Sequence, residues 1–244
     1  MRQELIIELV QQIRRCNKKM GGKKLYSLLQ AEIHCIDASM GRDKFFDLLR
    51  EQGMLVRRRR KYAVTTQSYH RFRVYENKLQ GFKPERSHQA WVCDITYIRI
   101  KTGFVYLFLI TDAYSRKIVG WELSNSLGLE GALQCLGMAI RQCPHPNGLI
   151  HHSDRGFQYC SHNYVGKLKA KGIAISMAEA GNCYQNAIAE RVNGILKGEY
   201  GLDETFNDER ETRQAVKEAI KAYNEQRPHW SLNLQIPTQV HDAA

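Results

Sequence analysis

The most restrictive feature of this sequence is an unbroken apolar run, FVYLFLI, at residues 104–110. A strand that meets solvent on one face alternates apolar and polar side chains, so a continuous run predicts a central strand that is covered on both faces. The run is also far shorter than the roughly 20 residues that a membrane-spanning helix needs. We therefore expect a sheet packed between helices, with residues 104–112 near its centre, and no membrane span.

The segments around this run have the patterns of further strands and helices. Trp91 and Cys93 fall on one face of the preceding segment, and Val92 and Asp94 fall on the other, which is typical of a strand. The links between the first three strands are short, so these strands should form an antiparallel meander. Strand-like and helical patterns alternate further on, which indicates a mixed α/β sheet flanked by helices. The expected strands are 89–100, 104–112, 117–123, 148–153 and 173–177, and the expected helices are 129–142, 163–172, 182–200 and 209–226.

Residues 1–61 have a helical period. An apolar face that includes Leu5 and Ile6 begins the chain, and two further short helical segments follow it. Three short helices with basic residues between them resemble a helix-turn-helix arrangement, although any small helical bundle has the same pattern. Residues 62–88 are polar and have no clear period, so we expect a linker there. The predicted domains are thus a basic helical, helix-turn-helix-like region at residues 1–61 and, after the linker, an α/β core with C-terminal helices at residues 89–244.

Positive charge is concentrated in the N-terminal third of the chain. Residues 1–89 hold 20 Lys and Arg against 9 Asp and Glu, and the remaining residues hold 16 of each, so the net charge of +11 lies entirely in this part. Such asymmetry favours contact with a polyanion such as nucleic acid over a solvated basic surface. We expect DNA contacts from the basic run at its peak, which consists of Arg57, Arg58, Arg59, Arg60 and Lys61.

The seven cysteines indicate a reducing compartment. Their number is odd, no two form a Cys-x-x-Cys pair, and none has a histidine at zinc-finger spacing. These features exclude a complete disulfide framework and favour reduced thiols. The N-terminus alternates charged and apolar residues and has no signal-peptide core, so we expect a cytoplasmic protein.

Three acidic residues stand out by their positions. Asp94 lies in the middle of a strand among apolar neighbours, where a carboxylate is costly unless it is paired or bound to a metal. Asp154 follows the fourth strand, so the two carboxylates would converge if the first and fourth strands were neighbours. Glu190 lies on a predicted helix, on the side opposite its apolar stripe. At that position it could also be an ordinary solvent-exposed glutamate without a functional role. The same side of that helix carries Asn186, Asn193 and Lys197.

The segments around these acids resemble a known family. The motifs WVCDITYI and HSDRGFQY, with 35 residues between Asp154 and Glu190, are similar to the Asp-Asp-Glu core of insertion-sequence transposases related to retroviral integrases. More narrowly, the chain resembles the OrfB product of elements that encode transposase in two reading frames. The resemblance also includes DAYSRKIVGW, GNCYQNAIAERVNGILKGE and YNEQRPHWSLNLQIPTQV, and it extends into the N-terminal helical segment. It implies a bacterial, nucleoid-associated protein with a ribonuclease-H-like, five-stranded mixed sheet.

The resemblance also implies roles for particular residues. Asp94, Asp154 and Glu190 match the three catalytic metal ligands, and Lys197 and Asn186 match residues that contact DNA near the reacting end. We also expect a DNA contact from Asn193. Gln185 departs from the family pattern, in which many relatives have Asp, but it is not one of the ligands.

The chemistry of phosphodiester transfer explains these residue types. Two Mg²⁺ ions, for which Mn²⁺ can substitute, activate the attacking oxygen and stabilise the leaving oxygen, and they prefer carboxylate ligands. The partners are then the element's DNA ends and target DNA. The resemblance further implies a homo-oligomer on DNA and cooperation with an upstream-frame product of the same element. Basic residues elsewhere in the chain would neutralise DNA phosphates.

Two other functions stay open at this point. One is a simple ribonuclease-H-like nuclease, which the basic helical region disfavours. The other is a catalytically inactive DNA-binding or regulatory protein, which loss of one of the three acids would have indicated. The roles of Asp112, His152, Tyr184 and Arg227 are also open, with a structural role favoured for Asp112 and His152.

Overall fold

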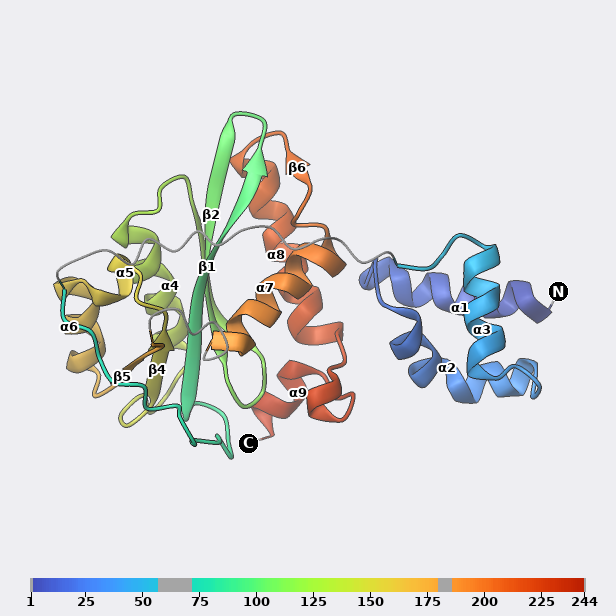
Figure 1. Cartoon of the computed structure of the whole chain (residues 1–244), viewed down its shortest axis with the longest axis horizontal. Coiled ribbons are helices and arrows are strands. Elements are labelled where there is room, and N and C mark those ends of the chain that lie inside the picture. Colours follow the sequence, from blue (N-terminus) through green and yellow to red (C-terminus); the bar gives the residue numbers. More distant parts are fainter. Residues whose placement is uncertain (1, 57–71, 180–185, 244) are drawn as a thin grey trace. The chain divides into compact units, whose positions relative to one another are not determined.

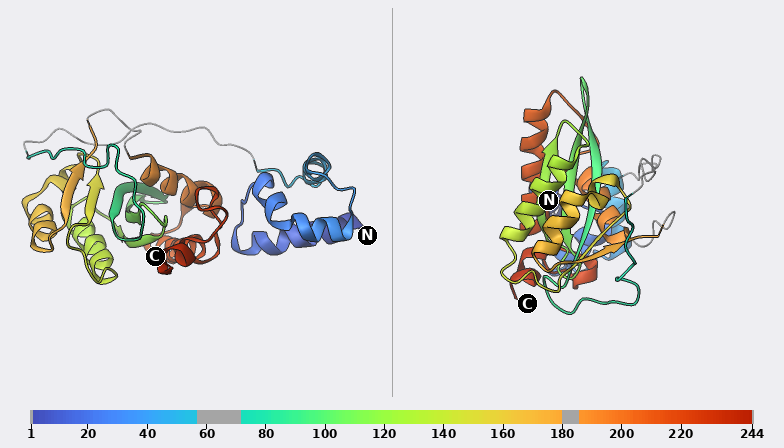
Figure 2. Two further views of the ribbon diagram at one scale, coloured as in Figure 1. Left: turned by 90° about the horizontal axis from the view of Figure 1, so that it is seen from below. Right: turned by 90° about the vertical axis from the view of Figure 1, so that its left-hand side faces the viewer.

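The computed structural model describes residues 2–56, 72–179 and 186–243. The chain divides into two compact units, a helical unit within residues 1–62 and a larger α/β unit built from residues 63–197 and 201–244. Each unit is shown in Figures 1 and 2 and has a core of its own. The basic run at residues 57–61 lies outside the described residues.

The helical unit contains three helices around one apolar core. They are α1 (Arg2–Cys16), α2 (Gly22–Ile36) and α3 (Arg42–Glu51). Ile6 is buried in this core, but Leu5 is 46% exposed, so the apolar face of α1 is centred one residue further along than the sequence pattern indicates. The helix contributes Val10 to the core one turn after Ile6. Because α2 and α3 bury apolar faces here, the polar side of α3 stays on the surface.

The α/β unit is built on the predicted mixed sheet, whose strand order is β3-β2-β1-β4-β5. The first three strands form the expected antiparallel meander, whereas β4 pairs in parallel with β1 and β5 pairs in parallel with β4. A two-residue strand, β6 (Thr205–Phe206), also pairs with the far end of β1. The main strands are β1 (Ala90–Ile100), β2 (Gly103–Asp112), β3 (Ile118–Ser124), β4 (Ile150–Ser153) and β5 (Ala174–Met177).

Helices cover both faces of the sheet, and the predicted apolar run in β2 is buried from residue 107 onward, whereas Phe104 at its start is 40% exposed. Side chains alternate between the two faces of β1. Trp91 and Cys93 face the core under α4 (Leu129–Arg141), α5 (Phe157–Cys160) and α6 (His162–Ala170). Ala90 and Val92 pack with Ala189 of α7 (Ala187–Tyr200) on the opposite face, and Figures 1 and 2 show α4 and α7 on opposite sides of β1. Asp94 has the same parity as Val92 and therefore faces α7.

The C-terminal helices run beside β3. Helix α8 (Glu209–Gln226) contacts β1, β3 and β6, and α9 (Pro237–Asp242) packs against α8. The side chain of Asn224 forms a bidentate pair with the outer edge of β3, because its Oδ1 accepts from Ile118 N at 2.9 Å and its Nδ2 donates to Ile118 O at 3.0 Å. This pairing satisfies backbone groups that an edge strand would otherwise expose.

The described residues contain neither a disulfide nor a membrane-spanning helix. The six cysteines in the described part of the chain, which excludes Cys183, are all free thiols. Within residues 2–56, 72–179 and 186–243, no helix combines the length and apolar character that crossing a membrane requires.

Candidate active site

The pairing of β1 with β4 brings two of the three predicted acids together. Val92 lies opposite His152 in this parallel pair. Asp94 is two residues beyond Val92, and Asp154 is two residues beyond His152, so the same register places both carboxylates at one level of neighbouring strands. Strand β4 ends at Ser153, which puts Asp154 in the turn that follows it.

The carboxylate of Asp94 is half-buried and is held at both oxygens. Oδ1 accepts from the backbone N–H of Ile95 at 2.9 Å, and Oδ2 accepts from Nδ2 of Asn193 at 2.7 Å. Burial raises the pKa of Asp94 to about 7, with a further increase from the neighbouring charge of Asp154 and a smaller one from Glu190. The two hydrogen bonds oppose this rise in pKa without cancelling it. A cation at this position would favour the ionised form.

Asp154 is held by the turn into α5. Its Oδ1 accepts from the backbone N–H of Gly156 at 2.9 Å. A Cβ atom at Gly156 would lie 3.1 Å from that same carboxylate oxygen, so the glycine lets the chain approach it closely. The Nε of Arg155, the residue between them, donates to the carbonyl of Ala178 at 2.9 Å and ties this turn to the chain after β5.

Glu190 lies in the first turn of α7 and is exposed. It is near enough to contribute to the raised pKa of Asp94, although its effect there is the smallest of the resolved causes. Within the three described stretches, no three His, Cys, Asp or Glu side chains are grouped closely enough to hold a metal ion. The structure thus brings Asp94 and Asp154 together and leaves Glu190 at the margin of the site.

The donor set of this site fits a hard divalent cation. Mg²⁺ and Mn²⁺ take carboxylate oxygens and keep several water ligands, so Asp94 and Asp154 can supply the protein part of such a site. The nearby soft or nitrogen ligands are engaged in the core, where Cys93 Sγ and His151 Nε2 are 2.9 Å apart. Burial lowers the pKa of His151 to about 3, so this imidazole is neutral. Its Nε2 also lies 2.9 Å from the hydroxyl of Tyr164.

The predicted DNA-contacting residues of α7 lie beside the same strand. The ammonium group of Lys197 is 4.4 Å from the centre of the Tyr97 ring. Burial lowers the pKa of Lys197, and attraction to Asp94 opposes this shift. Asn186 and Asn193 are buried, with exposed fractions of 6% and 8%, and both donate to β1. Their amide nitrogens are therefore used inside the protein.

The residues whose roles the sequence left undecided can now be placed where the structure describes them. Asp112 is fully buried and accepts hydrogen bonds from three backbone N–H groups and from Ser115 Oγ in the β2–β3 turn. His152 contacts Ser176 Oγ through Nδ1 at 2.8 Å. Arg227 is 2% exposed, which removes it from a surface contact with DNA. Tyr184 and Gln185 lie outside the described residues.

Two groups of residues near the site carry no recognisable sequence signal. A groove of about 460 Å³ lies between the segment before β1 and the chain at the end of β5. Arg155, the residue after Asp154, lines it. Ser115 Oγ lies 2.9 Å from Nδ1 of His241, which joins α9 to the β2–β3 turn. These contacts depend on how distant segments meet, so neither periodicity nor motif spacing predicts them.

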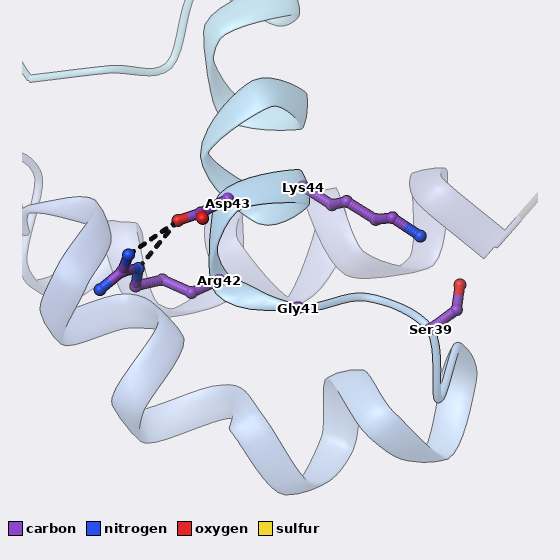
Figure 3. A pocket seen from close by; sticks show the side chains of 5 residues that line it. All are labelled: Ser39, Gly41, Arg42, Asp43 and Lys44. Carbon is purple, nitrogen blue, oxygen red and sulfur yellow. Dashed lines mark hydrogen bonds and ion pairs between the residues drawn. The ribbon is translucent and has the colours of Figure 1, made fainter.

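The polar side of α3 in the helical unit borders a shallow pocket of about 320 Å³ (Figure 3). Arg42 is paired with Asp43, its neighbour in sequence, at 2.9 Å. Lys44 and Ser39 lie apart from that pair on the other side of the pocket (Figure 3). Arg42, Asp43 and Lys44 are exposed in the first turn of α3.

Known sequences match both the core and most of the chain. Two family models of the integrase core domain match, one over residues 84–183 and the other over residues 171–237. A 31 kDa protein of insertion element IS600 from Shigella sonnei is 38% identical over 203 residues, which cover 82% of this chain and 75% of that protein. Transposase InsF of insertion sequence IS3A from Escherichia coli (strain K12) is 36% identical over 183 residues, which cover 74% of this chain and 64% of InsF.

Solved structures match at the level of the fold. The HTLV-2 integrase catalytic core domain, in complex with magnesium in its trimeric form, has a TM-score of 0.52 at 17% identity, with 65% of this chain and 99% of that chain covered. The simian T-cell lymphotropic virus intasome, in complex with a PP2A regulatory subunit, has a TM-score of 0.55 at 16% identity, with 91% of this chain and 74% of that chain covered. These likenesses confirm the predicted ribonuclease-H-like fold.

Proposed function

Because this chain belongs to the insertion-sequence transposases with an integrase-like core, we propose that it catalyses metal-dependent cleavage and strand transfer of DNA. The observation that carries the proposal is the register of β1 and β4, which places Asp94 and Asp154 side by side at the same height of the sheet. The raised pKa of Asp94 agrees with it, since strongly perturbed carboxylates are concentrated at functional sites.

The three acids have distinct places in the proposed reaction. Asp94 and Asp154 supply the central oxygen ligands, and Glu190 supplies a third ligand from the first turn of α7. These carboxylates would hold two divalent cations, Mg²⁺ or Mn²⁺, which when bound would supply Lewis-acid activation of the attacking oxygen and stabilisation of the leaving oxygen. Because the pKa of Asp94 is about 7, this carboxyl holds a proton in part of the metal-free molecules at neutral pH and releases it when the cation binds.

DNA contacts are assigned to both units of the chain. Lys197 carries positive charge beside Asp94 and suits a phosphate near the reacting end. In the helical unit, Lys44 and Arg42 present basic groups at the exposed start of α3 (Figure 3). The three short helices of this unit resemble a helix-turn-helix arrangement, which supports its use in DNA binding. The basic run at residues 57–61 would add phosphate contacts.

The family also suggests how the protein assembles. We infer that the active form is an oligomer of this chain on paired DNA ends, since the matching viral structure is an intasome. We also infer that an upstream-frame product of the same element takes part, as in two-frame elements of this kind. The reaction takes place on DNA, so the site of action is the bacterial nucleoid.

The test is strand cleavage and joining on labelled DNA that carries the element's ends. Wild type, Glu190→Gln and the matched control Glu225→Gln, an exposed glutamate of α8, are compared in Mg²⁺, in Mn²⁺ and in EDTA. We expect joined products from wild type and Glu225→Gln only when a metal is present, and none from Glu190→Gln.

Two other outcomes would replace the proposal. Cleaved products that are never joined to target DNA would indicate a simple nuclease. If wild type binds the ends but forms no product, even when fused to the upstream-frame product, the protein is a DNA-binding regulator.

A further inference from the structure

Helix α7 contacts β1 through two polar side chains as well as through apolar ones. Asn186 Nδ2 donates to the carbonyl of Cys93 at 3.0 Å, and Asn193 Nδ2 donates to Oδ2 of Asp94 at 2.7 Å. We call Asn186 and Asn193 the asparagine pair. The pair thus bonds to two consecutive residues of the strand that carries the first catalytic acid. One further turn along, Lys197 lies over the ring of Tyr97.

The spacing of the asparagine pair places Glu190 between its two members. Residues seven apart on an α-helix return to within about 20° of one line along its surface. Glu190 follows Asn186 by four residues and precedes Asn193 by three, so it lies within about 60° of both. When both asparagines are fixed on β1, the height and rotation of Glu190 relative to Asp94 are fixed as well.

The apolar side chains of α7 that meet the start of β1 are mostly short. The buried residues of this cluster are alanines and one valine, including Ala189 of α7, and Ile188 packs against them partly buried. Further along, α7 also buries Val192, Ile195 and Leu196. Short side chains let the helix come close to the strand but interlock weakly, so they restrict sliding along β1 less than large ones would. A directional hydrogen bond has a narrow range of length and angle, and two of them define a register.

Both asparagines are also incompletely satisfied. In the described part of the chain, Oδ1 of Asn186 and Oδ1 of Asn193 are buried without a hydrogen-bond donor. Such atoms carry a desolvation cost, which a purely apolar contact would avoid. Hydrated divalent cations carry water molecules that can donate to oxygens of this kind.

We propose that Asn186 and Asn193 are positioning residues, which register α7 on β1, hold the carboxylate of Asp94 and so place Glu190 for metal binding. The proposal rests on the proposed function and replaces the expected DNA contacts of these two residues. Their burial and their bonds to β1 direct their amide groups into the protein rather than toward DNA. Lys197 keeps its role at the DNA.

The first test measures metal and DNA binding separately in the full chain. Wild type, Asn193→Ala, Asn193→Leu and the control Asn163→Ala, an exposed asparagine of α6, are titrated with Mn²⁺ and followed by electron paramagnetic resonance. DNA binding is measured in EDTA by fluorescence anisotropy. Leucine has nearly the shape of asparagine without its polar atoms, so this variant keeps the packing if alanine lowers the yield of folded protein.

We expect both Asn193 variants to bind Mn²⁺ about 10–100-fold more weakly, as is typical for loss of a group that orients a metal ligand. Their affinity for DNA should stay within about twofold of wild type, and saturating Mn²⁺ should restore strand transfer. The opposite pattern, with weaker DNA binding and unchanged Mn²⁺ binding, would make Asn193 a DNA contact and overturn the proposal.

The second test separates this proposal from the proposed function. Hydrogen exchange of α7 is measured in EDTA on wild type, Asn186→Ala and Asn163→Ala, because register in the metal-free protein needs no catalysis. We expect the amides around Glu190 to exchange at least about tenfold faster in Asn186→Ala only. Unchanged exchange would refute the positioning role even if wild type is an active transposase, whereas a wild type that binds no Mn²⁺ would refute the proposed function.

Discussion

Replacing Asp94 by asparagine should benefit the stability of the metal-free protein more at high pH than at low pH. The folded-state pKa of Asp94 is about 7, against an ordinary value of 3.8, because burial and Asp154 disfavour its charge. The unfolded chain therefore loses this proton near pH 4, whereas the folded protein keeps it until about pH 7. The contribution of Asp94 to the free energy of unfolding of wild type is therefore fully present below pH 4 and is lost as the pH rises through 7.

The size of the effect follows from the shift. About three pKa units correspond to roughly 4 kcal/mol at pH 8. Because Asp94 is half-buried, we expect the effect of Asp94→Asn on the free energy of unfolding to be about 2–4 kcal/mol more favourable at pH 8 than at pH 4. Asparagine has one acceptor oxygen, so the loss of one of the two hydrogen bonds to residue 94 lowers stability at both pH values. For a chain of this length the difference between the two pH values corresponds to roughly 4–16 °C in Tm.

Urea unfolding in EDTA, followed by tryptophan fluorescence from pH 4 to pH 8, measures this difference. Trp91, Trp121 and Trp230 are all in the α/β unit, so the signal reports the part of the chain that contains Asp94. The control Glu225→Gln should show no pH-dependent gain. An effect of Asp94→Asn on stability that is the same at pH 4 and pH 8 would show that Asp94 does not carry the raised pKa.

Three further changes test other parts of the structure. Gly120→Ala should lower the free energy of unfolding by about 1–3 kcal/mol in urea melts, because a Cβ there would lie 2.6 Å from a backbone carbonyl of α4; an unchanged midpoint would contradict this packing. Ser115→Ala should cost about 1–3 kcal/mol in the same assay, because it removes a hydrogen bond to buried Asp112; stability equal to wild type would refute the role of this network. Lys44→Ala should weaken DNA binding and reduce the slope of log K against log salt by about 1; an unchanged slope would remove α3 from the DNA interface.

The sequence was most informative where burial acts on a whole segment. The run at residues 104–110 predicted a strand covered on both faces, and residues 107–112 are buried without interruption. The meander also followed from the short links between the first three strands, whereas the adjacency of the first and fourth strands was only a condition for the convergence of Asp94 and Asp154. Those patterns result from the hydrophobic effect and from chain connectivity, which act on residue types rather than on exact geometry.

The side of α7 that faces the sheet could not be read in the same way. A helical projection groups Asn193 with Glu190, and this polar side would ordinarily point at water. In the structure Asn193 is turned to Asp94, because one polar residue of β1 gives the amide a partner. The pairing depends on two segments about 100 residues apart, and neither segment alone contains that information.

Other misses have similar causes. Strand β6 has two residues, which are too few for any period. Part of the segment predicted as a linker lies along β5, where Lys78 N donates to Ser176 Oγ at 2.8 Å. That contact uses a backbone N–H, which every residue except proline has, so the sequence does not indicate which residue will form it.

The two outer strands of the sheet are both engaged by other parts of their own chain. Asn224 occupies the outer edge of β3 at Ile118, and at the other border Met177 N donates to Glu76 O at 3.4 Å beside the Lys78 contact. An edge strand with unpaired backbone N–H and C=O groups can pair with a strand of another molecule, and repeated pairing of this kind leads to aggregation. The oligomer on DNA that we propose would have to form without polymerisation through its sheets. With both edges occupied at these residues, contacts between copies in such an oligomer would be left to helix and loop surfaces and to the DNA.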